Sequence, residues 1–145
     1  MSEFVIWSDV EVRFRDTDAM GHVNNAVFVT YLEVARQTYW KRLDATAGYE
    51  RVPFILAHVS IDFRSPVRVG EVVRVHLRTT WVGRSSFGMQ YELRERDSGR
   101  LVAEATTTQV TYDYTQHRPI PVPDGLRRSL EQIEGHPLPE KPRRP

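Results

Sequence analysis

The stretch DTDAMGHVNN, residues 16–25, leads directly into AVFVTYLEVARQTYWKRL, residues 26–43, and these two segments decide the fold. Two aspartates and a glycine in the first segment favour a turn. Asn24 or Asn25 then offers a side-chain oxygen that caps the first free amides of a helix. Apolar residues cover most of the circumference of the predicted helix 26–43, while polar residues recur at three- and four-residue steps as one narrow stripe that runs just past its end: Thr30, Glu33, Gln37, Lys41 and Asp44. Such a helix is mostly buried.

Alternating apolar and polar residues predict five strands that cover this helix. Residues 10–14 form the first, and the opposite parity of Val5 and Trp7 indicates a bulge or bend near Ser8 and Asp9. After the helix, the same period predicts strands at residues 55–63, 73–81, 86–95 and 101–112, with a hairpin at residues 97–99 and a short helix at 125–133. The order predicts an α+β fold in which an antiparallel sheet curls around one helix.

Length and composition set the expected organisation. A chain of 145 residues, 40% of them hydrophobic, has enough apolar surface for one core. We expect a single domain over residues 1–135. Residues 136–145 are rich in proline and arginine, and we expect a disordered tail there. A lone five-stranded sheet leaves an open edge, so we also expect the chain to form a homodimer or a homotetramer.

Charge and residue content exclude several classes of function. The 20 basic and 19 acidic residues are interspersed and give a net charge of +1, so no nucleic-acid partner and no membrane partner is expected. The absence of cysteine excludes disulfides, a thiolate nucleophile and cysteine-ligated metal sites. The five histidines lack metal-ligand spacing, so no metal is expected. The N-terminus lacks a basic leader with an apolar run, and no apolar stretch approaches about 20 residues, which predicts a cytoplasmic protein.

Three blocks of the sequence resemble a known family: VRFRDTDAMGHVNNAVFVTYLEVAR, SIDFRSPVRVGEVVRV and WVGRSSFGMQYEL. They are similar to acyl-CoA thioesterases of the 4-hydroxybenzoyl-CoA thioesterase type, over about residues 10–123. The first block, joined to a buried helix and to Pro66, Gly70 and Glu71, is the most specific part. The resemblance implies a hotdog fold, a five-stranded antiparallel sheet wrapped around one long buried helix. It also implies an acyl-CoA substrate, with no cofactor beyond the coenzyme A of that substrate.

The resemblance also assigns catalytic roles. The carboxylate equivalent to Asp18 attacks the thioester or activates a water against it, and the backbone amide at the position of Asn25 polarises the carbonyl. Some bacterial relatives carry histidine or tyrosine at that position. His22, with Asn24 and Asn25, is instead similar to the HVNN run of plant acyl-carrier-protein thioesterases, in which the histidine is assigned an assisting role. We therefore take Asp18, His22 and Asn25 as candidate catalytic residues.

The residue types suit this chemistry. Thioester hydrolysis needs a nucleophile or base and a site for the charge that develops on the carbonyl oxygen. Unpaired amides at a helix start hold such an oxyanion, and the same field favours an ionised Asp18. Gly21 either lets the thioester approach the turn closely or is simply a turn glycine. Asp16 is expected to be structural, and it pairs with an arginine or caps the turn.

Coenzyme A carries phosphates, which arginine and hydroxyl donors bind well. Arg84, Ser85 and Ser86 follow Gly83 in a predicted turn, and in relatives the matching turn contacts the nucleotide end of coenzyme A. Gly21 and Asn24 complete the predicted substrate site, and Arg64 with Arg68 form a weaker basic cluster. Two other functions stay open: an acyl-carrier-protein thioesterase, and an acyl-CoA-binding protein without turnover. Aromatic, short and long acyl groups are all compatible with the sequence.

Overall fold

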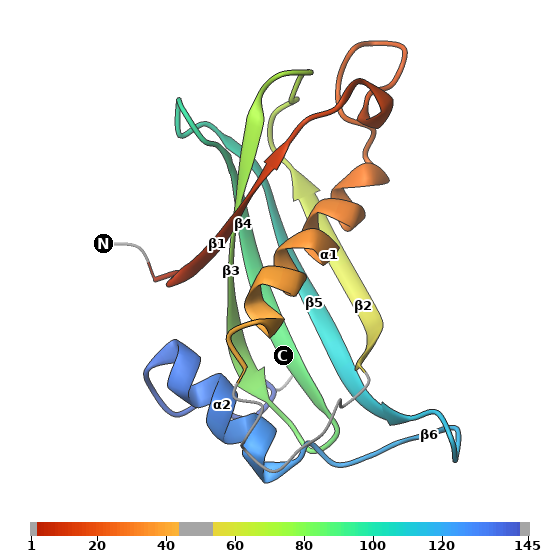
Figure 1. Cartoon of the computed structure of the whole chain (residues 1–145), viewed down its shortest axis with the longest axis vertical. Helices are drawn as coiled ribbons and strands as arrows, with labels where there is room; N and C mark the ends of the chain where they lie inside the picture. The colour runs from red at the N-terminus through yellow and green to blue at the C-terminus, as the bar shows by residue number, and fades with distance from the viewer. Residues whose placement is uncertain (1–2, 44–53, 143–145) are drawn as a thin grey trace. The chain divides into compact units, whose positions relative to one another are not determined.

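The computed structural model describes residues 3–43 and 54–142. Five strands form one sheet in the order β1-β3-β4-β5-β2, and a two-residue strand, β6, pairs antiparallel with β5. The elements follow each other as β1 (Ile6–Glu11), η1 (Phe14–Asp16), α1 (Val27–Trp40), β2 (Phe54–Phe63), β3 (Val72–Val82), β4 (Ser86–Glu95), β5 (Leu101–Asp113), β6 (Arg118–Pro119) and α2 (Asp124–Glu134). Figure 1 labels the strands and both α-helices. The predicted α+β architecture is confirmed, with β6 added.

Contacts along the chain divide it into two compact units. Unit 1 comprises Met1–Lys41, Ser60–Leu77 and Tyr91–Ala105, and unit 2 comprises Arg42–Val59, Arg78–Gln90 and Thr106–Pro145. Helix α1 belongs to unit 1 and helix α2 to unit 2. The single domain expected for residues 1–135 stays a prediction.

Strand β1 begins and ends earlier than the alternation of its side chains predicts. Its antiparallel pairing with β3 runs without interruption over all six residues of β1. Ile6 and Val12 are buried while Trp7 is half exposed, so the even positions face inward throughout. The bulge predicted near Ser8 and Asp9 is therefore wrong, because Trp7 is an outward-facing residue of a regular strand and Val5, also exposed, precedes that strand.

The chain leaves the sheet after residue 12, where the alternation predicts a strand to Phe14. The backbone N–H and the guanidinium of Arg13 both donate to the carboxylate of Asp16, and this contact curls residues 14–16 into the 3-10 helix η1. Phe14 is left 83% exposed. A local side-chain contact thus overrides the hydrophobic pattern.

Helix α1 is buried along one side and ends at Trp40, whereas its apolar pattern predicts a mostly buried helix; Val34, for example, is 42% exposed. Within unit 1 it packs against β1. The ring of Phe28 meets that of Phe63 edge-on at 5.3 Å, and Arg36 Nη1 donates to the Tyr91 hydroxyl at 3.2 Å. Its buried side chains are those of Phe28, Tyr31, Leu32, Ala35, Arg36 and Tyr39. Asp44, the last residue of the predicted polar stripe, lies outside the described residues.

The second half of the chain follows the predicted strands closely. Strand β4 has the predicted bounds, and β2, β3 and β5 extend the predicted strands by one or two residues. The hairpin at residues 97–99 is confirmed, since the Glu95 carboxylate accepts hydrogen bonds from two of its amides. No helix among the residues described is long and apolar enough to cross a membrane.

The described part of the C-terminal tail, residues 136–142, contacts the rest of unit 2, and the disorder expected for residues 136–145 stays a prediction. In unit 2, the Leu138 side chain is buried and its N–H donates to the Glu131 carboxylate at 2.7 Å. The Pro139 carbonyl accepts a hydrogen bond from Val82 N–H, at the end of β3. The buried Leu138 side chain and the hydrogen bond from Val82 N–H therefore hold the described part of the tail, to residue 142, despite its proline-rich composition.

Candidate active site

The turn that holds Asp18 is a small hairpin within unit 1. Thr17 and Val23 form an isolated antiparallel bridge, and the Asp18 backbone N–H donates to the His22 carbonyl at 2.8 Å. One carboxylate oxygen of Asp18, Oδ1, accepts hydrogen bonds from Met20 N–H at 2.8 Å and His22 N–H at 3.3 Å. The other oxygen, Oδ2, accepts none from the described residues. The turn therefore fixes the carboxylate by one oxygen and leaves the second available.

Gly21 supplies the left-handed residue of this turn. Its φ is +78°, and a Cβ added there meets nothing within 4 Å. Because L-residues rarely adopt this conformation, the backbone alone explains the glycine. The structure thus favours a turn glycine over one needed for a close approach of substrate.

Asp16 anchors the hairpin to the helix. Its carboxylate accepts hydrogen bonds from Arg13 Nη2 at 2.8 Å and from the Tyr31 hydroxyl of α1 at 2.9 Å. Burial raises the pKa of the Asp16 carboxyl, but the hydrogen bonds from Arg13 and Tyr31 outweigh it and hold the pKa below its ordinary value. Burial, and then the hydrogen bond to Asp16, raise the pKa of the Tyr31 hydroxyl, which stays a donor. The structural role expected for Asp16, with an arginine partner, matches these contacts.

All but one of the backbone amides that lead into α1 donate a hydrogen bond to a described residue. The Asn24 N–H donates to the Asp16 carbonyl at 2.9 Å, and the Asn24 side-chain oxygen accepts from Ala26 N–H. The next two amides donate to backbone carbonyls: Val27 N–H to Asn24 and Phe28 N–H to Asn25. The Asn25 N–H has no acceptor among the described residues. A single unpaired donor therefore stands at the positive end of the helix.

Asp18, His22 and Asn25 line one cavity of about 300 Å³ in unit 1. The structure therefore brings the three candidate catalytic residues together, whereas Gly21 and Asn24 shape the turn without lining the cavity. His22 Nε2 is buried and has no hydrogen-bond partner in the part of the chain that the structure describes, which is unusual for a polar atom. The remaining lining residues are Val23, Phe28, Phe63, Arg64, Ser65 and Pro66.

The segment that closes this cavity, residues 63–66, has no strong signal in the sequence. It reaches the turn because Val23 N–H donates to the Val67 carbonyl and because His22 and Arg68 form an isolated bridge. Arg64, which belongs to the weaker basic cluster of the sequence, donates to the Glu104 carboxylate at 3.1 Å. Pairings between residues 40 or more positions apart leave no local pattern in the sequence.

Arg84 and Ser85 lie in the turn between β3 and β4, and Ser86 begins β4; all three belong to unit 2, and none of them lines the Asp18 cavity. Their backbone groups are used within that unit. Gly83 N–H donates to the Ser86 carbonyl, Thr111 N–H to the Ser85 carbonyl and Val122 N–H to the Arg84 carbonyl. The Arg84 side chain makes no hydrogen bond or ion pair with the residues described.

Residues 12–130, most of the chain, match the Thioesterase-like superfamily. The chain belongs to this superfamily. A thioesterase of Thermus thermophilus, solved with coenzyme A and zinc, is 36% identical, with a TM-score of 0.83 over 95% of this chain and all of that one. The 1,4-dihydroxy-2-naphthoyl-CoA hydrolase of Nostoc punctiforme is 30% identical over 83% of this chain and 82% of its own length. The long-chain acyl-CoA thioesterase FadM of Escherichia coli is 24% identical over 87% of this chain and 97% of its own length.

This member of the thioesterase superfamily is therefore a thioester hydrolase with the hotdog fold that the sequence predicts. The cavity is lined by Asp18, whose Oδ2 accepts no hydrogen bond from the described residues, and by Asn25, whose N–H finds no acceptor among them. Within residues 3–43 and 54–142, no group of three His, Asp or Glu side chains is placed to hold a metal ion.

Proposed function

We propose that the enzyme hydrolyses an acyl-CoA thioester to a carboxylic acid and free coenzyme A. One observation carries the proposal: Asp18 and the start of α1, with its single unpaired amide, line the same cavity. The names of two relatives, a 1,4-dihydroxy-2-naphthoyl-CoA hydrolase and a long-chain acyl-CoA thioesterase, support a CoA thioester as substrate. Coenzyme A then enters only as part of the substrate.

In the proposed reaction, the thioester carbonyl oxygen accepts a hydrogen bond from Asn25 N–H. The partial positive charge of the helix N-terminus stabilises the negative charge that develops on this oxygen. Asp18 Oδ2 either attacks the carbonyl carbon, which gives a mixed anhydride that water then hydrolyses, or takes a proton from a water that attacks instead. In both routes the C–S bond breaks and the thiolate of coenzyme A takes up a proton. Detection of an acylated Asp18 by rapid quenching and mass spectrometry would select the first route.

The other candidate residues take supporting roles in the proposal. His22, whose Nε2 lacks a partner, hydrogen-bonds the substrate or orients the water. Gly21 and Asn24 keep the turn and the helix start in place beside the substrate. Arg84, Ser85 and Ser86 bind the phosphates of coenzyme A, a role that suits the unengaged guanidinium of Arg84.

Asp18→Asn tests the proposal. We expect the variant to lose about 10²- to 10⁴-fold in kcat on its best acyl-CoA substrate, because the carboxylate that attacks or takes the proton is gone. Asp97→Asn, at an exposed carboxylate of the β4–β5 hairpin, is the matched control and should keep the wild-type rate. A panel of acyl-CoA and acyl-carrier-protein thioesters separates the alternatives. Turnover of carrier-bound substrates alone favours the acyl-carrier-protein thioesterase, and binding without turnover above that of Asp18→Asn favours the non-catalytic protein.

Two further parts of the proposal concern the surroundings of the reaction. No step of the mechanism uses a metal, so enzyme treated with EDTA and dialysed should keep its rate, and loss of activity restored by one divalent ion would contradict this. We also propose a cytoplasmic location, where coenzyme A thioesters are made and used, and a homodimer or a homotetramer as the working form.

A further inference from the structure

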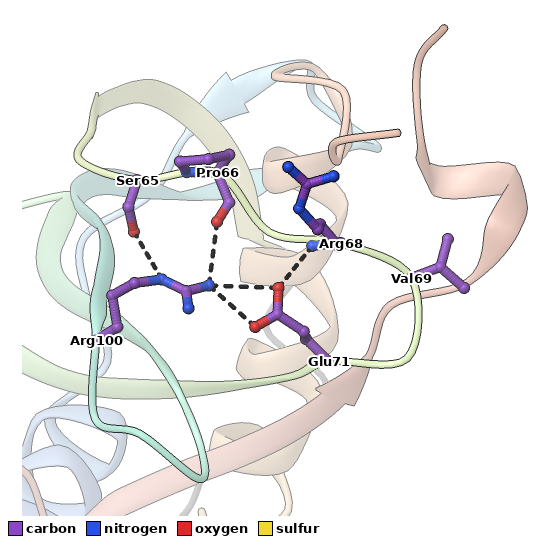
Figure 2. Close-up of a pocket in the computed structure, with 6 residues that line it drawn as sticks. All are labelled: Ser65, Pro66, Arg68, Val69, Glu71 and Arg100. Carbon is purple, nitrogen blue, oxygen red and sulfur yellow. Dashed lines mark hydrogen bonds and ion pairs between the residues drawn. The ribbon is translucent and has the colours of Figure 1, made fainter. Parts of the chain in front are cut away.

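A second cavity of unit 1, of about 480 Å³, adjoins the Asp18 cavity (Figure 2). The two cavities share Ser65 and Pro66, so the loop between β2 and β3 is a wall common to both. The other residues that line the second cavity are Arg68, Val69, Glu71 and Arg100. Its lining therefore holds two cationic side chains and one anionic side chain.

The anionic group of this cavity is the Glu71 carboxylate, and both of its oxygens accept hydrogen bonds. Arg100 Nη2 lies 3.1 Å from Glu71 Oε2 in an ion pair, and also donates to the Pro66 carbonyl. The second Glu71 oxygen, Oε1, accepts the backbone N–H of Arg68 at 2.8 Å. Arg100 is held further by Ser65 Oγ, at 3.2 Å from its Nε. Glu71 thus neutralises Arg100, and neither of its oxygens accepts a hydrogen bond from the Arg68 side chain.

The Arg68 guanidinium makes no hydrogen bond or ion pair with the described residues. This sets it apart from Arg13, Arg64 and Arg100, each of which pairs with a carboxylate. Figure 2 shows the Arg68 side chain directed away from the pair of Arg100 and Glu71. One positive charge on the cavity wall is therefore uncompensated.

The position of Arg68 is tied to the candidate active site by the backbone. Arg68 lies opposite His22 in an isolated antiparallel bridge, next to the hydrogen bond from Val23 N–H to the Val67 carbonyl. Side chains directly opposite each other in such a pair leave the same face, with Cβ atoms about 4.5–5.5 Å apart. The Arg68 side chain therefore starts beside that of His22, which lines the Asp18 cavity.

We propose that Arg68 binds a carboxylate at the far end of the acyl group, so that the enzyme prefers acyl thioesters that carry a second acidic group. This inference rests on the proposed function, because it places the thioester at Asp18. The planar guanidinium donates to a carboxylate through two parallel hydrogen bonds. The phosphates of coenzyme A are the other anionic source, but the pantetheine arm separates them from the sulfur by many bonds, whereas Arg68 lies opposite His22.

The test compares four thioesters: hexanoyl and adipoyl groups, each on coenzyme A and on N-acetylcysteamine, which has no phosphate. We expect Arg68→Met to lower the adipoyl-to-hexanoyl ratio of kcat/KM about tenfold on both carriers, because the charge-assisted hydrogen bonds are lost. Arg68→Lys should keep part of the ratio. Arg15→Met is the matched control, since Arg15 is exposed, makes no hydrogen bond or ion pair with the described residues and lines neither cavity. It should leave the ratio unchanged.

Calorimetry gives the corresponding adipoyl-to-hexanoyl ratio of binding affinities. It uses thioether analogues of the four substrates bound to Asp18→Asn, so this ratio does not depend on turnover. An unchanged ratio in Arg68→Met, by rate or by binding, overturns the inference. An equal fall in kcat/KM for both CoA thioesters, with no change for either N-acetylcysteamine thioester, also overturns the inference and assigns Arg68 to a phosphate. Loss of the proposed function would show differently, as an absence of turnover for all four thioesters in the wild type.

Discussion

At the scale of the residue, Asp16 determines the geometry of the turn without a part in the chemistry. The residue is 2% exposed, its carboxylate accepts hydrogen bonds from Arg13 and from the Tyr31 hydroxyl, and its carbonyl accepts one from Asn24 N–H. We expect Asp16→Asn to lower the free energy of unfolding by about 1–3 kcal/mol at pH 7, because buried donors lose a charged acceptor. Urea unfolding measures this. In a double-mutant cycle, Tyr31→Phe should lower the free energy of unfolding by less in the Asp16→Asn variant than in the wild type.

The lowered pKa of Asp16 gives this effect a pH dependence. A carboxyl whose pKa is lower in the folded state contributes stability that is complete above its unfolded value of about 3.9 and is lost as the pH falls through the folded value. The stability gap between wild type and Asp16→Asn should therefore narrow below about pH 4. A gap of constant size from pH 7 down to pH 3 would contradict the assignment.

Two reasons for a glycine at position 21 can be told apart by mutation: the positive φ of the turn and the close approach of a thioester. A Cβ at Gly21 meets no protein atom within 4 Å, so Gly21→Ala should cost about 1–2 kcal/mol of stability through its positive φ alone. Gly99→Ala is a close control, since Gly99 has nearly the same φ, +76°, and equal space. Both variants should lose similar stability in thermal unfolding and keep the wild-type KM. A KM raised by Gly21→Ala and not by Gly99→Ala would restore the close approach of the thioester as the reason for this glycine.

At the scale of the element, β3 and β4 pack through an aromatic ring on a glycine. A Cβ at Gly88 would lie 1.9 Å from Trp81 Nε1, so the indole occupies the space of the missing side chain. Gly88→Ala should therefore cost about 1–3 kcal/mol and change the fluorescence of Trp81. At Gly83 the nearest atoms are 3.5 Å away, so Gly83→Ala should cost less. If Gly88→Ala is equally costly with Trp81→Ala already present, the ring is not the cause.

The elements that the sequence predicts well are those with a long, regular period. β4 keeps its predicted bounds because Phe87, Met89, Tyr91 and Leu93 are all buried. The predictions fail where one contact overrides the period. The pairing of Arg13 with Asp16 creates η1 where the alternation predicts a strand.

In the candidate site, too, the sequence predicts the local arrangement and misses the long-range contacts. Asp18, His22 and Asn25 lie within eight positions of one another, so a turn before a helix already indicates that they meet. The contribution of the loop between β2 and β3 depends on backbone pairing to residues 22 and 23, and no local pattern encodes it. For the same reason, the sequence marks Arg64 and Arg68 as one basic cluster, whereas the structure neutralises only Arg64.

At the scale of the whole molecule, β2 ends the sheet and exposes apolar side chains. Leu56, Val59 and Phe63 are 36%, 37% and 45% exposed, and an end strand also presents unpaired N–H and C=O groups. We expect a second copy of the chain to pair along β2, so light scattering at micromolar concentration should give the mass of a dimer or tetramer. Val59→Lys should lower this mass, because it places a charge in the interface. Val34→Lys, at an exposed valine of α1, should not. A monomeric wild type would contradict the assembly, and dissociation by Val34→Lys alone would move the interface from β2 to the helix.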